Sequence, residues 1–236
     1  MHTTKKLACT LPALLAATTL AQQITPVNDY RYMTFEAQAN TDFGADQSQD
    51  EYHASDLLEI PFDPWSYTYG LSANYQSASA NTNGTMDTVI TATSIRGSAS
   101  VYGFSQILDE TGYDAGGGTA AVMQVGFTLD QASTWEIIAT LMADSGGVAQ
   151  VTLSQGLNPG GNILFTSTNS VINEQINLES GDYTLTVTAS VYAQLFGEGM
   201  RELEASFDAQ FNLVPAPASS SLVILGLALT ARRRRS

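Results

Sequence analysis

The sequence predicts an all-β protein whose central part is an antiparallel β-sandwich of jelly-roll-like topology. Three observations lead to this fold class. Apolar and polar residues alternate with a period of two over much of residues 22–213, as in strands with one buried face. Clusters of glycine, asparagine and proline interrupt the alternation at short intervals. No stretch keeps the period of an amphipathic helix, which argues against a parallel βαβ architecture.

Residues 1–21 have the three zones of a secretory signal peptide. Two lysines precede an apolar run over residues 7–20, and a small-x-small pattern ends at Ala21. The run is too short to stay in a membrane as a spanning helix. We expect the export machinery to remove it between Ala21 and Gln22. Cys9, the chain's single cysteine, would leave with it, so the mature protein would have no disulfide.

The first half of the body predicts strands of uneven quality. A first strand is expected over residues 30–37, where tyrosine and threonine alternate with apolar residues. The acidic stretch 40–56 is typical of a long loop or a ragged sheet edge. Residues 65–75 alternate regularly and predict a strand. We expect a hairpin turn at residues 81–84, with the return strand over residues 88–93.

The second half predicts a more regular series of strands. Their spacing of roughly 8 to 14 residues favours a sandwich or barrel. The glycine run 114–118 is the weakest candidate domain boundary, or else a loop between sheets, and we treat residues 22–213 as one domain. The strands are expected at residues 120–129, 134–142, 149–154, 162–166, 172–178, 183–193 and 202–214.

The charge distribution separates the body from the two ends. The body holds all 23 acidic residues and only three basic ones, Arg31, Arg96 and Arg201, which gives it a formal net charge of −20. A body of this charge repels phosphate backbones, so nucleic acid is excluded as its partner. The charge favours solubility, with attraction of divalent cations as the alternative.

Residues 214–236 form a tail of three consecutive parts. The 14 residues 218–231 would cover about 21 Å as a helix, less than the roughly 30 Å of a hydrocarbon core. The basic cluster keeps the C-terminus cytoplasmic and therefore places the body outside. The prolines leave an extended segment open to an enzyme. In order, the parts are the motif Val214, Pro215, Ala216 and Pro217, the membrane segment with Leu222, Val223, Ile224, Leu225, Leu227 and Leu229, and the cytoplasmic stop Arg232, Arg233, Arg234 and Arg235.

A proline motif, a brief apolar helix and an arginine cluster in this order resemble the PEP-CTERM sorting signal. The resemblance covers residues 214–236, about a tenth of the chain. It implies that an exosortase-like enzyme recognises and removes the tail, in bacteria that make extracellular polysaccharide. Ala216 stands where family members carry the glutamate of Val-Pro-Glu-Pro, so the resemblance does not settle which sorting enzyme recognises this variant. An ordinary tail anchor with a basic stop is the alternative.

Catalytic motifs are scarce in the sequence. His53 is the body's one histidine and lies in an acidic stretch, which argues against a Ser-His-Asp triad. The sequence has no nucleophile elbow, zinc-protease helix or phosphate loop. One histidine without cysteine is also a poor donor set for zinc or copper. We therefore expect no enzyme, with glycan cleavage by two carboxylates as a distant alternative.

Calcium is the one metal that the acidic residues could hold, because it takes several oxygen ligands from loops. The acidic residues are densest in residues 40–56 and 109–114, and neither segment has the spacing of a known calcium loop. Solvated surface is therefore the favoured interpretation. No cofactor is therefore expected, with calcium as a weak alternative. The candidate ligands are Asp42, Asp46, Asp50, Asp109 and Asp114, with Asn40, Asp56 and Glu110 beside them.

The aromatic stripe of residues 65–75 allows two interpretations. Trp65, Tyr67 and Tyr69, with Tyr75 beyond them, share one face of the predicted strand. Exposed, they would form a flat platform on which sugar rings stack. Buried, they would pack into the core, which is the favoured interpretation. Exposure of the side chains decides between the two.

Taken together, these patterns predict an exported protein of the cell surface or extracellular matrix with a structural or adhesive role. It would be anchored transiently by its C-terminal helix and processed at the sorting signal by an exosortase-like enzyme. Extracellular polysaccharide is the candidate partner outside the cell. The alternative is a carbohydrate-binding module that uses the aromatic stripe, with or without calcium.

Overall fold

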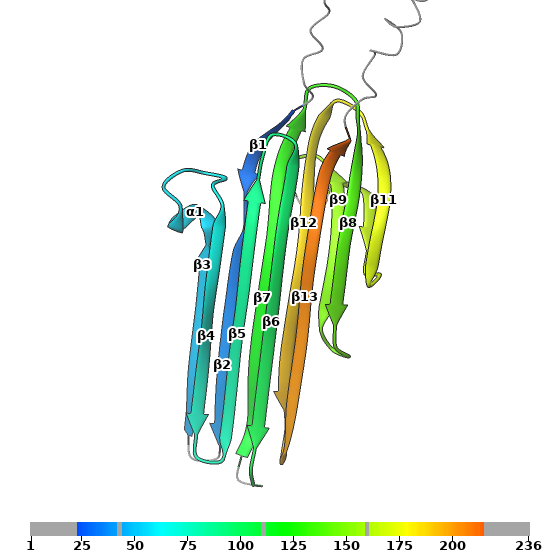
Figure 1. Ribbon diagram of the computed structural model, residues 1–236. Helices are drawn as coiled ribbons and strands as arrows, with labels where there is room; N and C mark the ends of the chain where they lie inside the picture. The colour runs from blue at the N-terminus through cyan, green and yellow to red at the C-terminus, as the bar shows by residue number, and fades with distance from the viewer. Residues whose placement is uncertain (1–22, 42–43, 110–111, 159–160, 215–236) are drawn as a thin grey trace, which may run out of the picture.

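The computed structural model describes residues 23–41, 44–109, 112–158 and 161–214. Two antiparallel sheets lie face to face in an elongated sandwich (Figure 1). The predicted all-β sandwich is therefore confirmed. The expected signal peptide, its cleavage site, and the tail from Pro215 onward lie outside the described residues. In the described part of the chain, no helix has the length and apolarity needed to cross a membrane.

One sheet, here called sheet A, contains seven strands. Its two longest strands, β7 and β12, lie side by side in the middle, because every residue of β12 pairs with β7. The first strand, β1, pairs with the C-terminal part of β7, where it continues the line of β2. In spatial order the sheet is β10 (Asn162–Ser167), β9 (Val148–Gln155), β12 (Gly181–Leu195), β7 (Gly112–Leu129), β2 (Tyr32–Thr41) and β3 (Gly44–His53), with β1 (Ile24–Asp29) beside β7.

The other sheet, sheet B, contains six strands. The chain crosses into it from sheet A after the single-turn helix α1 (Ala54–Leu57). The last strand of the chain lies in its interior, between β8 and β6. In spatial order the sheet is β11 (Val171–Leu178), β8 (Ser133–Ala143), β13 (Gly199–Val214), β6 (Ser94–Ile107), β5 (Ala78–Ile90) and β4 (Trp65–Tyr75).

The eight strands from β6 to β13 pair in a nested order. β9 pairs with β10, β8 with β11, β7 with β12 and β6 with β13. This is the order of one long hairpin that is rolled up so that successive pairs alternate between the sheets, as in a jelly roll. The five earlier strands extend both sheets on the same side, and they end in the edge strands β3 and β4 (Figure 1).

Side chains from the two inner faces form the core. The predicted inward face of the last strand is confirmed, since every second residue of β13 from Leu203 to Leu213 is buried. The same holds for β12 from Tyr183 to Val191 and for β7 from Met123 to Leu129. Removing these apolar faces from water supplies the main stabilisation, at about 25 cal/mol per Å².

In the first half, the predicted hairpin turn is wrong, and the acidic stretch takes the second of its two predicted forms. Residues 81–84 form no turn, because β5 runs through them, and the chain instead reverses at Gln76, which has a left-handed φ of 53°. The acidic stretch 40–56 is no long loop. Most of it is β3, the edge strand of sheet A, which agrees with the ragged-edge alternative. An edge strand needs only one paired side, so its sequence can stay polar.

The glycine run 114–118 is neither a domain boundary nor a loop, because it lies inside β7. A Cβ atom on Gly117 would lie within 3.0 Å of the carbonyl oxygens of Asn81 and Phe104 in the facing sheet. One on Gly103 would meet the Gly117 backbone in the same way. These glycines therefore let the backbones of the two sheets approach closely.

Candidate functional site

The aromatic stripe of β4 points into the sandwich. Trp65 is 3% exposed, and Tyr67 and Tyr69 pack against the core. The Tyr69 ring lies 5.3 Å from Phe35 in sheet A, edge to face. The favoured interpretation, in which the stripe packs into the core, is therefore confirmed, and the alternative of an exposed sugar platform on Trp65, Tyr67 and Tyr69 is excluded. The alternating aromatic side chains of this edge strand fill the space between the two sheets.

Tyr67 and Tyr69 belong to a hydrogen-bonded cluster that joins the edge strands β3 and β4. The Tyr69 hydroxyl donates to Asp50 Oδ2 at 3.0 Å. Burial raises the pKa of Tyr67 to about 12, with a further contribution from hydrogen bonding with Tyr52. Hydrogen bonding with Tyr52, and then with Asp50, raises the pKa of Tyr69. The cluster thus keeps both phenols neutral and closes the open edge of the sandwich.

Among the described residues, the candidate calcium ligands do not gather into a cation site. Asp46 Oδ2 accepts a hydrogen bond from the Asn74 backbone N–H at 2.9 Å, and Asp50 accepts the one from Tyr69. Both carboxylates therefore link β3 to β4. Asp114 lies on β7, Asp109 follows β6, and Asp42 is outside the described residues. Within the described ranges, no three His, Cys, Asp or Glu side chains gather as a metal site would require.

His53 lies at the end of β3. Its Nε2 is 3.0 Å from Glu51 Oε1, and its ring is 5.3 Å from that of Tyr32. Neither partner is the serine, cysteine or threonine that a triad uses as its nucleophile. This geometry agrees with a surface role for the histidine.

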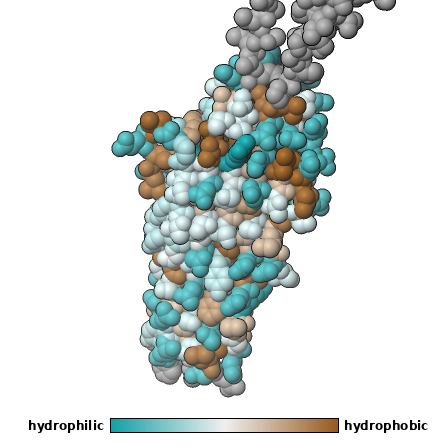
Figure 2. Space-filling view, viewed as in Figure 1, coloured by the Kyte–Doolittle hydropathy of each residue, from teal (hydrophilic) through white to brown (hydrophobic). Residues whose placement is uncertain are grey.

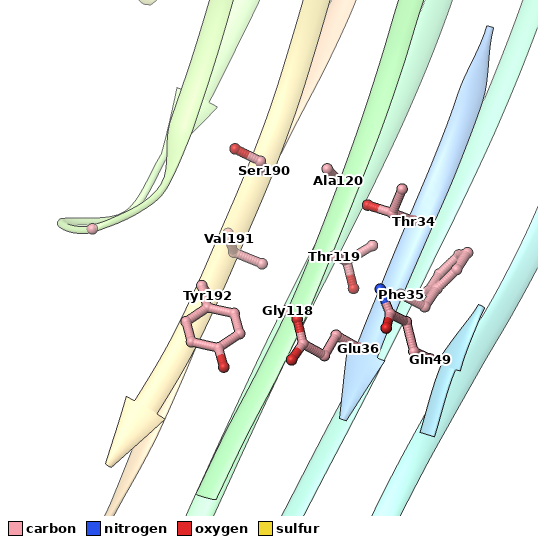
Figure 3. A pocket seen from close by; sticks show the side chains of 11 residues that line it. Thr34, Phe35, Glu36, Gln49, Gly118, Thr119, Ala120, Ser190, Val191 and Tyr192 are labelled. Atoms are coloured by element: carbon pink, nitrogen blue, oxygen red, sulfur yellow. The ribbon is translucent and has the colours of Figure 1, made fainter. Parts of the chain in front are cut away.

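A shallow depression of about 290 Å³ lies on the outer face of sheet A (Figure 3). Strands β12, β7, β2 and β3 run side by side beneath it, and Gly146 of the β8–β9 turn reaches its margin. The floor is low because β7 presents Gly118 and Ala120, which have little or no side chain. The outward-facing side chains around this floor are Thr34 and Glu36 of β2, Gln49 of β3, and Ser190 and Tyr192 of β12.

Tyr192 lies flat across the glycines of β7. A Cβ atom on Gly118 would be 3.0 Å or less from two carbons of its ring, and one on Gly116 would be 2.8 Å from its hydroxyl oxygen. The Gln38 side-chain amide on β2 donates a hydrogen bond to that hydroxyl at 3.1 Å. One ring face is thus seated on backbone and its tip is anchored, while 37% of the residue stays exposed.

The surroundings of Tyr192 carry negative charge. Glu36 extends over β7 toward the tyrosine (Figure 3). Burial raises the pKa of the Tyr192 phenol, and the carboxylates of Glu36 and Asp114 add to the rise. The neighbouring cation is Arg201, which donates to the Gln194 carbonyl at 3.4 Å near the margin. The depression therefore offers a neutral aromatic face, hydroxyls, an amide and a carboxylate, all suited to hydrogen-bonding uncharged polar ligands.

Sequence reasoning did not find this site. Thr34 and Glu36 stand at alternate positions of the strand predicted over residues 30–37, but the face that they share is polar and gives no reason to choose it. Tyr192 stands among threonines in β12, on the face opposite the core. The signal in the sequence is one large aromatic residue on an otherwise small, polar face of the strand, and its place opposite the glycine run of β7 follows only from the register.

No protein-family model matches the sequence, and no curated protein matches it either.

Proposed function

We propose that this chain is an exported protein of the cell surface or extracellular matrix, with a structural or adhesive role. Its tail would be processed by an exosortase-like enzyme at Val214, Pro215, Ala216 and Pro217. The charge distribution supports export, because basic residues flank an acidic body at both ends of the sequence. The polar outer surface supports exposure to water. On the face in Figure 2, apolar residues occur in small separate patches.

The observation that carries this proposal is where the body begins and ends. The Ile24 N–H donates to the Ala92 carbonyl at 2.7 Å, and the Leu213 N–H donates to the Thr93 carbonyl at 2.9 Å. Both ends of the sandwich therefore meet the same turn between β5 and β6. Val214 is the last residue of β13 and pairs with Thr134. Cleavage before residue 23 and after residue 214 would leave every strand in place.

Mass spectrometry of the protein recovered from its producing cells tests the proposal. We expect a mature N-terminus at Gln22 and a C-terminus without the four arginines. Recovery of the intact tail from an exported, membrane-bound protein would instead favour an ordinary tail anchor. An intact chain in the cytosol would contradict export altogether.

A paired substitution in the tail sharpens this test. Replacing Pro215 and Pro217 together with alanine should block processing and leave the arginines attached, since the motif would be lost. Replacing Ser219 and Ser220 with alanine also makes two substitutions in the tail, but outside the motif, and should leave processing intact. Equal processing of both variants would show that the proline motif is not what the enzyme recognises.

Carbohydrate binding is the second candidate function, and the depression around Tyr192 favours it. The inward orientation of Trp65, Tyr67 and Tyr69 removes the platform first considered for this role. Tyr192 supplies an exposed ring with polar groups around it. This candidate is compatible with an adhesive role beside extracellular polysaccharide, and calcium is not needed for it.

A further inference from the structure

We propose that the depression on sheet A binds a neutral polysaccharide, with one sugar ring stacked on Tyr192. This inference rests on the proposed adhesive role and names its ligand. It places binding on the outer face of sheet A, over β12, β7, β2 and β3, and not on the aromatic stripe of β4, which points into the sandwich. Nothing in it depends on how the tail is processed.

The strand register builds the depression row by row. In one row, Glu36 pairs with Gln49 on one side and with Gly118 on the other, and Gly118 pairs with Tyr192. Four strands at about 4.8 Å spacing make this row about 14 Å wide. The volume of about 290 Å³ lies at the low end for small-molecule sites. The site therefore fits a short stretch of a chain, whose remaining sugars stay in water.

Tyr192 is held in place before any ligand arrives. Its ring rests on the backbone at Gly116 and Gly118, and Gln38 fixes its hydroxyl. Flexible side chains lose conformational entropy when a ligand fixes them, and this loss weakens binding. Because the Tyr192 ring is already immobile, it loses little. Its free face is apolar, and this face is what the C–H surface of a pyranose ring packs against.

The polar groups of the depression match the other surfaces of a sugar. Thr34 and Ser190 contribute hydroxyls, Gln49 contributes an amide, and Glu36 contributes a carboxylate acceptor. Sugar hydroxyls both donate and accept, so they can satisfy this mixed set. An apolar ligand would leave these groups unpaired, at a cost in binding free energy.

Charge selects a neutral glycan over an acidic one. Glu36 and Asp114 lie close enough to Tyr192 to raise its pKa, and the whole body carries a formal charge of −20. A uronate or sulfate group would be repelled at this site and at long range. Access is open along β12, because β9 pairs with it only as far as Ser190, just short of Tyr192.

Affinity electrophoresis of the exported protein tests the inference. The neutral probes are a β-1,4-glucan derivative, a mixed-linkage β-glucan, a galactomannan and a soluble α-glucan, and the acidic probes are alginate and polygalacturonate. We expect at least one neutral probe to retard the protein and both acidic probes to leave it unretarded. Retardation by no neutral probe would overturn the inference, as would retardation by the acidic probes alone.

Variants then locate the binding. Tyr192→Ala should weaken binding by about tenfold or more, as expected for loss of a central aromatic contact. Gly118→Ala should weaken it similarly, because the new methyl group would displace the ring. Tyr192→Phe keeps the ring and should stay within about threefold of the parent protein. The matched control is Tyr30→Ala, which removes a tyrosine that is 50% exposed outside the depression.

The outcomes separate this inference from the proposed function. Thermal unfolding of each variant shows whether it is folded. If Tyr192→Ala does not fold, the binding affinity of Tyr192→Phe is compared with that of the parent protein instead. Binding that survives Tyr192→Ala and Gly118→Ala in folded protein would overturn the inference, even if tail processing is found as proposed. Loss of binding in Tyr192→Phe equal to that in Tyr192→Ala would also overturn it, since stacking would not be the main contact.

Discussion

Arg31 is a fully buried charge at the break between β1 and β2. Its Nε donates to Asp29 Oδ1 at 2.7 Å, and Nη2 pairs with Asp29 Oδ2. Nη1 donates to Thr88 Oγ1 at 2.7 Å and to the Asp63 carbonyl at 3.0 Å. The guanidinium thus connects sheet A with β5 of sheet B and with the crossing segment before β4.

Replacing Arg31 with methionine should lower the free energy of unfolding by about 3–5 kcal/mol, because Asp29 would stay buried without its partner. Urea denaturation followed by circular dichroism measures the change. Arg96→Met, at an exposed position of β6, is the matched control and should change stability by less than about 0.5 kcal/mol. Equal effects of the two substitutions would show that the burial of Arg31 contributes nothing.

The raised pKa of Tyr67 makes the stability of the fold depend on pH in the alkaline range. Its pKa in the folded protein is about 12, against an ordinary 10.0. The unfolded chain therefore releases the phenolic proton first, and stability should fall as pH rises from about 10 to about 12. Below about pH 10 this contribution is complete.

Tyr67→Phe should make the loss of stability between about pH 9 and about pH 11.5 smaller, because phenylalanine has no proton to release. Unfolding free energies at several pH values give the slope for each protein. Tyr30→Phe, at an exposed position, is the control and should keep the parent slope. A Tyr67→Phe slope equal to that of the parent would contradict the raised pKa.

The glycine run of β7 lets the two sheets approach each other closely. Gly117 faces the carbonyl oxygens of Asn81 and Phe104 without room for a methyl group. We expect Gly117→Ala to force the sheets apart and lower the free energy of unfolding by about 1–3 kcal/mol, the usual cost of overpacking. Gln124→Ala, on the outer face of the same strand, should change it by less than about 0.5 kcal/mol. A neutral Gly117→Ala would show that the sheets can yield locally.

At the same scale, some elements could be predicted and others could not. The strands β8, β9, β12 and β13 alternate between buried and more exposed residues, and each of β8, β9 and β12 is followed by a turn that contains glycine, so their positions follow from residue type. β6 was missed because glycines and serines at six of its 14 positions blur the alternation of Ile95, Val101 and Ile107. In β5, Asn81 and Gly84 have turn chemistry, but pairing with strands on both sides overrides it.

For the whole molecule, the sandwich class followed from the sequence, whereas the candidate site did not. Alternation tells which side chains share a face, and burial of that face then follows from hydrophobicity. The depression depends on register, since Gly118 must lie between Glu36 and Tyr192, residues that are 156 positions apart. Long-range register is set by the packing of both sheets and leaves no local signal.

The unbroken course of β13 sets a length for the molecule. Its 16 residues span about 50 Å at about 3.3 Å per residue. The turn that opens it, next to the exposed Phe196, therefore stands about 50 Å from Val214. If the proposed surface protein is attached through its C-terminus, Val214 lies next to the point of attachment, and the turn at the other end of β13 is the part that extends up to about 50 Å from it toward a neighbouring cell or fibre.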